Sequence, residues 1–258
     1  MSPTSSAYYL GLFVCVTCMF FFINDASAET ITVQTDGTGD YTSIRDAVNA
    51  ANPGDVISVG SGEYYEYQIA VQDQNLKIVG AGIDATYVNA YDSILFRVYS
   101  NGVEISGFSL NKDSNARAVH VNYEAEDATV NNVKIYSTDN YGIYVEGTGF
   151  TLKNSIVGVE SYYQQSYGLY LNSNSQSSTV EDNTFQGNGI YIESDQNQIT
   201  GNTISEPGNH GISVQGSNNQ ISGNTIANSG DWSINLYGEG NTLESNTVTD
   251  SPVNEDTS

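Results

Sequence analysis

The sequence repeats itself at an offset of 22 residues, and this periodicity limits the range of folds more than any other feature. The segment NQITGNTI at 197–204 returns as NQISGNTI at 219–226, and a weaker copy, NTLESNTV, occupies 241–248. β-Branched residues alternate with polar ones in each copy, which is typical of short β-strands. Strands this short cannot bury an apolar face alone, so we predict that successive copies stack as the coils of a solenoid.

One apolar residue per copy aligns the repeats along the chain. These anchors are Ile78, Ile105, Val130, Leu152, Val180, Ile199, Ile221 and Leu243. A second alternating segment follows in most repeats, as in Gly142–Val145 and Gly189–Ile192, and Gly, Asn and Ser residues fill the gaps between segments. The apolar positions of stacked coils would line one continuous interior, with about 4.8 Å between neighbouring backbones.

The third residue after the anchor is asparagine in four successive late coils. These residues are Asn183, Asn202, Asn224 and Asn246, whereas the same position holds Phe108, Val133 and Ser155 in earlier coils. Side-chain amides that stack at the coil spacing can donate and accept hydrogen bonds along their column. We therefore interpret the four asparagines as a structural ladder at a turn and not as catalytic residues.

The first 28 residues are expected to form a signal peptide. The apolar run Leu10–Ile23 has 14 residues, which is short for a membrane span, and Ala26-Ser27-Ala28 fits a cleavage site. The chain would then be secreted or lie on the cell surface, with no membrane span after cleavage. Because no basic residue precedes Arg45, an uncleaved N-terminal anchor is the alternative.

The rest of the chain is expected to form one elongated domain. An N-terminal strand and capping helix would occupy residues 29–55, β-helix coils 56–250 and a polar tail 251–258. Ile44, Ala47 and Val48 share one face of the expected helix, which Ser43 would cap. The tail offers no apolar helix to cover the last coil, so this edge could pair with another chain and form an oligomer.

Composition excludes several classes of function. The chain has 30 Asp+Glu but only 7 Lys+Arg, so its formal charge of −23 makes nucleic acid a poor partner. Both cysteines and both methionines lie within the predicted signal peptide. Cleavage would leave a chain without disulfides, thiolate nucleophiles or a Cys/Met copper site.

Two segments resemble known β-helix proteins. Residues 36–51 (DGTGDYTSIRDAVNAA), with PGDVISV at 53–59 and GEY at 62–64, resemble the N-terminal cap of right-handed parallel β-helix proteins such as pectin methylesterases. The later coils are similar to the carbohydrate-binding and sugar hydrolysis repeats, which also occur in the NosD-like family. This resemblance covers roughly residues 30–250 and implies an all-β fold, a single right-handed parallel β-helix of about nine or ten coils.

The resemblance does not extend to the catalytic motifs of these relatives. The pectin methylesterase motifs are absent, and no arginine follows Arg117. Asn209-His210-Gly211 faintly resembles a polygalacturonase motif, but the accompanying Asp pair and basic motif are missing. The chain does not provide the ligands for a NosD-like copper site, because its two histidines, His120 and His210, would lie about four coils apart and could not share one ion. No cofactor is expected, although scattered acidic side chains could bind Ca²⁺ loosely.

One feature of the coils suggests ligand binding. Alternation places His120, Tyr144, Tyr170, Tyr191, Ser213 and Asn235 on the outer surface of successive coils. Aromatic rings beside hydrogen-bonding groups suit sugar rings, so the candidate contact residues are Tyr144, Tyr170, Tyr191, Trp232 and His210. The structural alternative is ordinary stacking of aromatic residues across strands.

We therefore expect a non-catalytic module that presents a rigid face to polysaccharides or to cell-envelope proteins. The alternative is a polysaccharide lyase or glycoside hydrolase. Its candidate catalytic residues are Glu146 and Glu193, two coils apart, and Arg117.

Overall fold

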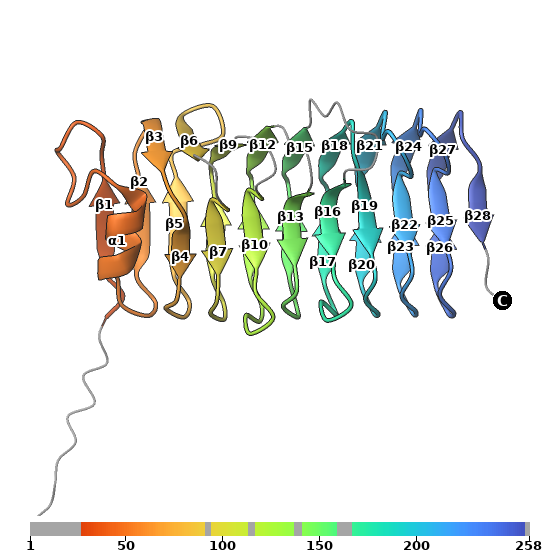
Figure 1. Ribbon diagram of the computed structural model, residues 1–258, viewed down its shortest axis with the longest axis horizontal. Coiled ribbons are helices and arrows are strands. Elements are labelled where there is room, and N and C mark those ends of the chain that lie inside the picture. The colour runs from red at the N-terminus through yellow and green to blue at the C-terminus, as the bar shows by residue number, and fades with distance from the viewer. Residues whose placement is uncertain (1–26, 91–93, 113–116, 137–140, 159–166, 256–258) are drawn as a thin grey trace, which may run out of the picture.

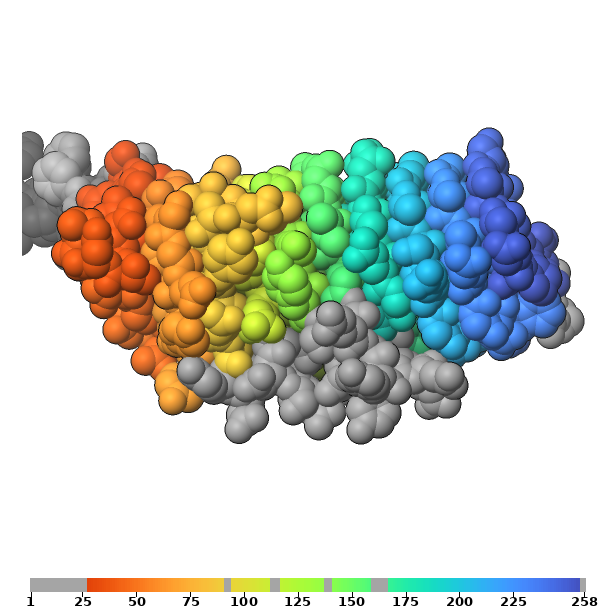
Figure 2. All heavy atoms as spheres, turned by 90° about the horizontal axis from the view of Figure 1, so that it is seen from above, coloured from red at the N-terminus to blue at the C-terminus, as the bar shows by residue number. Residues whose placement is uncertain are grey.

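The structure, a computed structural model, describes residues 27–90, 94–112, 117–136, 141–158 and 167–255. Over these residues the chain is an all-β, right-handed parallel β-helix of about nine turns, with one short helix, α1 Ile44–Ala50 (Figure 1). The predicted fold class is confirmed. Figure 2 shows the coils side by side in chain order from the N-terminus to the C-terminus.

Three parallel sheets run the length of the solenoid, and each coil adds one strand to each sheet. Sheet A contains β1 Thr30–Val33, β2 Val56–Val59, β5 Lys77–Gly80, β8 Glu104–Ser106, β11 Thr129–Asn131, β14 Thr151–Lys153, β17 Thr179–Glu181, β20 Gln198–Thr200, β23 Gln220–Ser222 and β26 Thr242–Glu244. Sheet B contains β3 Gly62–Glu66, β6 Thr86–Ala90, β9 Ser109–Lys112, β12 Lys134–Tyr136, β15 Ile156–Gly158, β18 Thr184–Gln186, β21 Thr203–Ser205, β24 Thr225–Ala227 and β27 Thr247–Thr249. Sheet C contains β4 Ile69–Val71, β7 Phe96–Val98, β10 Val119–Val121, β13 Tyr141–Val145, β16 Tyr167–Leu171, β19 Gly189–Ile192, β22 Ile212–Val214, β25 Ile234–Leu236 and β28 Val253–Glu255.

The eight predicted anchors form one column of sheet A. Each anchor is the parallel-strand partner of the next, from Ile78 with Ile105 through to Ile221 with Leu243. All of them except Leu243 in the last coil are buried. The repeat alignment is thus confirmed, and the apolar side chains share one enclosed interior because every coil is in register with its neighbours.

The predicted asparagine ladder occupies the turn between sheets A and B. The side-chain oxygens of Asn202, Asn224 and Asn246 each accept from Nδ2 of the preceding asparagine in the column, at 3.0 Å. The same oxygens accept the backbone N–H of that residue at 2.9–3.0 Å. The buried turn therefore satisfies its polar groups from one coil to the next.

A second ladder, which the analysis of the sequence missed, lies in the turn between sheets C and A. Asn197 donates to Asn219, and Asn219 donates to Asn241, from both Nδ2 and the backbone N–H at 2.8–3.1 Å. These asparagines open the three repeated segments NQIT, NQIS and NTLE. Their identical spacing of 22 residues was the signal that could have revealed them.

Helix α1 covers the N-terminal end of the core. It contacts β1, β2, β3 and β4, so it reaches strands of all three sheets in the first coils. Ile44, Ala47 and Val48 are buried, and Ser43 caps the helix. The buried carboxylate of Glu66 accepts the Ile44 N–H at 2.6 Å, which satisfies a donor at the start of the helix.

The C-terminal end carries one more strand than the predicted boundary at residue 250 allows. Strand β28 pairs in parallel with β25 and lies inside the segment expected to be a polar tail. Most of the predicted signal peptide, residues 1–26, lies outside the described part of the chain. No helix among the described residues has the length and apolar character needed to cross a membrane.

Candidate functional site

One column of side chains points outward along sheet C. In register order it contains Arg97, His120, Tyr144, Tyr170, Tyr191, Ser213 and Asn235. The residues on either side of each position, such as Ile143 and Val145 around Tyr144, are buried in the core. The column therefore brings Tyr144, Tyr170 and Tyr191 onto consecutive coils, separated by about 4.8 Å.

The tyrosine rings contact one another but do not form a flat platform. The Tyr144 and Tyr170 centroids are 5.1 Å apart with the rings at 73°, and those of Tyr170 and Tyr191 are 5.1 Å apart at 49°. Tyr167, at the start of β16, stacks on Tyr191 at 5.0 Å and 24°. All of these rings are partly buried. Cross-strand stacking thus uses part of each ring, and the remaining surface is open to solvent.

The phenols of this face keep their protons at neutral pH. Burial is the largest cause that raises the pKa values of Tyr144, Tyr170 and Tyr191. For Tyr170 a hydrogen bond to the Glu193 carboxylate raises the pKa further. Burial also raises the pKa of Tyr167 to about 12. These side chains are therefore hydrogen-bond donors and not phenolate bases.

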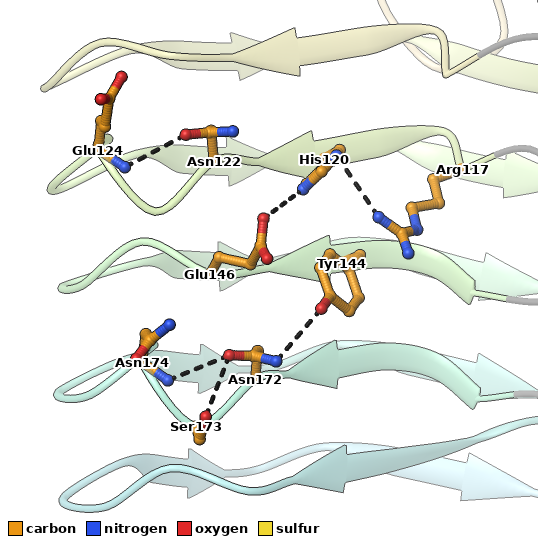
Figure 3. A network of polar contacts seen from close by, with 9 residues as sticks. All are labelled: Arg117, His120, Asn122, Glu124, Tyr144, Glu146, Asn172, Ser173 and Asn174. Atoms are coloured by element: carbon orange, nitrogen blue, oxygen red, sulfur yellow. Dashed lines mark hydrogen bonds and ion pairs between the residues drawn. The ribbon is translucent and has the colours of Figure 1, made fainter.

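A polar network surrounds His120 at one end of the tyrosine column (Figure 3). His120 Nε2 lies 2.8 Å from Glu146 Oε2, and His120 Nδ1 lies 3.5 Å from an Arg117 guanidinium nitrogen. Because a guanidinium can only donate, Nδ1 accepts and the ring proton on Nε2 is donated to Glu146. The ring is only 5% exposed, and burial is the main cause that lowers the pKa of His120. The imidazole is thus neutral at pH 7, with both nitrogens engaged.

Two arginines lie in this region, and neither has a carboxylate partner among the described residues. The Arg117 guanidinium carbon sits 3.7 Å from the centre of the Tyr144 ring, and that of Arg97 sits 5.2 Å from the centre of the Tyr99 ring. Within the described part of the chain, neither arginine forms a salt bridge, and Arg97 Nε is buried without a hydrogen-bond partner. In a chain of charge −23, this end of sheet C is thus notable for two neighbouring arginine side chains.

Amides and carboxylates line the column at the ends of the same strands. Asn172 Nδ2 donates to the Tyr144 hydroxyl at 3.2 Å, and the Asn172 side-chain oxygen accepts from the turn that follows (Figure 3). The candidate acids Glu146 and Glu193 follow β13 and β19, two coils apart. Each of these carboxylates accepts a hydrogen bond from a neighbour, Glu146 from His120 and Glu193 from the Tyr170 phenol.

His210 and Trp232 lie on a later part of the same face. His210 Nδ1 accepts the Trp232 backbone N–H at 3.3 Å, and Nε2 lies 3.2 Å from Asn235 Nδ2. The two histidines are four coils apart, roughly 19 Å, so they do not share a ligand. Among the residues that the structure describes, no cluster of three or more His, Cys, Asp or Glu side chains could hold a metal ion.

The sequence-based list of contact residues lacked Arg97 and Asn172. Arg97 is the strand partner of His120, so extending the column by one coil would have found it. Asn172 follows Leu171 at the end of its strand, and its bond to Tyr144 in the preceding coil depends on the side-chain conformation. A strand alternation pattern cannot predict such a conformation.

Comparison with known proteins supports the fold. Residues 167–255 match the family described as "Right handed beta helix region". The chain is a right-handed parallel β-helix protein. No curated protein matches this β-helix protein in sequence.

Several solved β-helix structures are similar to it. The catalytic domain of a GH87 α-1,3-glucanase in complex with nigerose aligns over 87% of this chain and 46% of its own, with 18% identity and a TM-score of 0.69. The A-module of a mannuronan C-5 epimerase from Azotobacter vinelandii aligns over 80% of this chain and 72% of its own, with 15% identity and a TM-score of 0.58. An alginate lyase from Paenibacillus sp. aligns over 88% and 99%, with 15% identity and a TM-score of 0.57. The chain spans less than half the length of the glucanase domain, and these identities show a shared fold.

Proposed function

We propose that this β-helix protein binds a polysaccharide along the outer face of sheet C and does not cleave it. The observation that carries the proposal is the column Tyr144, Tyr170 and Tyr191, whose partly exposed rings lie beside the Arg117 guanidinium, 3.7 Å from the centre of the Tyr144 ring. Sugar rings have apolar faces that pack on aromatic side chains, and their hydroxyls bond to phenols and amides. The rigid solenoid holds these groups at fixed spacing, so little ordering accompanies binding.

The arginines favour a polysaccharide that contains acidic sugars. Arg117 and Arg97 present positive charge that no carboxylate of the described chain neutralises by a salt bridge. A guanidinium is well suited to bind the carboxylate of a sugar acid, because two of its N–H groups can donate in parallel. The names of the structural neighbours, a mannuronan epimerase, an α-1,3-glucanase and an alginate lyase, support a polysaccharide as the ligand class.

The states of His120 and of the tyrosines favour binding over cleavage. A general base needs a free lone pair within reach of the substrate. His120 is buried with both nitrogens in hydrogen bonds, so it has no free lone pair. Glu146 and Glu193 each accept a hydrogen bond, from His120 and from the Tyr170 phenol, and keep further acceptor positions. The tyrosines have raised pKa values, so none supplies a phenolate base at neutral pH.

A lyase or hydrolase activity is the second candidate. It is favoured by one observation, namely that Arg117, His120 and Glu146 form a continuous polar network beside Tyr144 (Figure 3). Absorbance at 235 nm and release of reducing sugar would report elimination and hydrolysis respectively. If either signal appears with wild type and disappears with His120→Gln, the protein is an enzyme and the non-catalytic proposal is wrong.

The binding proposal is tested by affinity gel electrophoresis in gels that contain alginate or polygalacturonate. We expect both Tyr170→Ala and Arg117→Ala to weaken binding about tenfold. The control is Tyr67→Ala, which removes a tyrosine that is 60% exposed directly after β3. Equal retardation of wild type, Tyr170→Ala and Arg117→Ala would contradict the proposal.

We also propose that the protein is secreted or lies on the cell surface. This part rests on the apolar segment Leu10–Ile23 and the cleavage motif Ala26-Ser27-Ala28. N-terminal sequencing of the exported protein should start at Glu29. A chain that keeps residues 1–28 and stays with the membrane fraction would instead support an uncleaved anchor.

A further inference from the structure

A second set of exposed aromatic residues lies on sheet B. Sheet B runs along the top of the solenoid in Figure 1, and Figure 2 looks down on that side. Four residues occupy one outward column in consecutive coils. In register order they are Tyr65, Asn89, Asn111 and Tyr136. Two tyrosines thus bracket a pair of asparagines on a surface separate from the sheet C face.

The backbone beneath this column is rigid. The residues that alternate with it, Tyr64, Val88, Leu110 and Ile135, are buried in the core, at most 2% exposed. Tyr65 and Tyr136 are 59% and 37% exposed and lie three coils apart, about 14 Å. Between them, Asn111 Nδ2 donates to Asn89 Oδ1 at 3.1 Å. That bond fixes the two amides relative to each other and uses only one donor of Asn111.

The charge of this surface differs from that of the sheet C face. The column itself contains no charged residue, and the adjacent column contributes one charge of each sign, Glu63 and Lys134. Both of these residues are turned to the tyrosines. The Tyr65 hydroxyl donates to Glu63 Oε2 at 3.0 Å, and Lys134 Nζ lies 4.8 Å from the centre of the Tyr136 ring. These two columns thus carry one charge of each sign, and the outward column offers aromatic rings with amides between them.

We propose that the Tyr65–Tyr136 column is a binding site for an uncharged polysaccharide. The glycan chain runs along the solenoid axis, with one sugar ring against Tyr65 and another against Tyr136. Asn89 and Asn111 bind hydroxyl groups of the sugars between them. This site goes beyond the proposed function, because it lies on another sheet, takes a ligand of different charge and does not require the sheet C site.

The test is affinity gel electrophoresis in gels that contain laminarin, dextran or xyloglucan, three neutral polysaccharides. Wild type is expected to be retarded by at least one of them. Tyr65→Ala and Tyr136→Ala should each weaken that binding by about tenfold, since each removes one aromatic contact. Both positions are on the surface, and unchanged thermal unfolding of the variants would show that the fold is retained.

Two control variants separate this proposal from the function proposed for sheet C. Tyr123→Ala removes a tyrosine outside the column that is 64% exposed, and Arg117→Ala weakens the sheet C site. Both controls should bind the neutral polysaccharide as wild type does. If none of the three polysaccharides retards the wild type, or if Tyr65→Ala and Tyr136→Ala bind as wild type does, the proposal is wrong. Binding that is lost only in Arg117→Ala would also overturn it, because the ligand would then occupy sheet C.

Discussion

Asn202 donates twice to the side-chain oxygen of Asn224 in the next coil, from its backbone N–H at 2.9 Å and from Nδ2 at 3.0 Å. Nδ2 of Asn224 in turn donates to the Ile199 carbonyl at 2.8 Å. Both asparagines are fully buried. The ladder therefore satisfies turn groups that water cannot reach, and its members are structural.

Asn224→Ala is expected to lower the free energy of unfolding by about 2–4 kcal/mol, since it leaves buried donors and an acceptor without partners. The adjacent exposed residue provides the control, because Thr225→Ala should cost less than about 1 kcal/mol. Guanidinium titrations followed by circular dichroism would measure both changes. Equal midpoints for the two variants would show that the ladder does not stabilise the fold.

Two strand glycines should respond differently to alanine. A methyl group on Gly189 would overlap the backbone carbonyl oxygens of His210 and Gly211 in the next coil. One on Gly158 would meet no described residue nearer than 3.5 Å. We expect Gly189→Ala to cost about 2 kcal/mol or more, because the coils cannot move apart locally. Gly158→Ala should be neutral or stabilise by up to about 1 kcal/mol, since alanine loses less conformational freedom on folding. Comparable melting temperatures for both variants would refute this account.

His120 should make the protein less stable in mild acid. Burial lowers its pKa in the folded state below the ordinary value of 6.5, so the unfolded chain binds a proton at a higher pH. The free energy of unfolding therefore falls as the pH drops below 6.5 towards the folded pKa.

His120→Gln should flatten the melting-temperature profile between pH 7 and about 5. Glu66, whose pKa burial raises, contributes with the opposite sign, but it is common to both proteins and cancels in the comparison. A variant profile parallel to that of wild type would show that His120 is not held neutral by the fold.

Tyr167 should lower the free energy of unfolding at high pH. Its folded pKa of about 12 exceeds the ordinary value of 10.0, mainly because the ring is buried. The unfolded chain therefore loses the phenol proton first, and stability falls as the pH rises from 10 towards 12. Tyr167→Phe should remove part of this decline, measured by urea unfolding at pH 8, 10 and 11. At pH 8 the variant should cost about 1 kcal/mol, because the hydroxyl loses its hydrogen bonds with Asn209, at 3.4 Å, and with Ser213.

The 22-residue period was enough to predict the solenoid. Alternation decides which side chains point inward, and in a stack of coils a regular repeat also decides which residues lie above one another. The anchors from Ile78 to Leu243 and the ladder from Asn183 to Asn246 follow from these two facts alone. Even the column of Tyr144, Tyr170 and Tyr191 could be located, because it belongs to the same repeat.

Only the tertiary structure decided what these side chains contact. His120 and Glu146 are 26 residues apart in the chain, and they meet because they lie in adjacent coils. Arg117 forms a hydrogen bond with the other ring nitrogen of His120. The tilt of the Tyr144 and Tyr170 rings and the burial of His120 depend on rotamers and on neighbouring columns. The sequence repeat determines which residues lie above one another along the axis of the solenoid. Contacts between neighbouring columns depend on side-chain conformations, which the repeat does not specify.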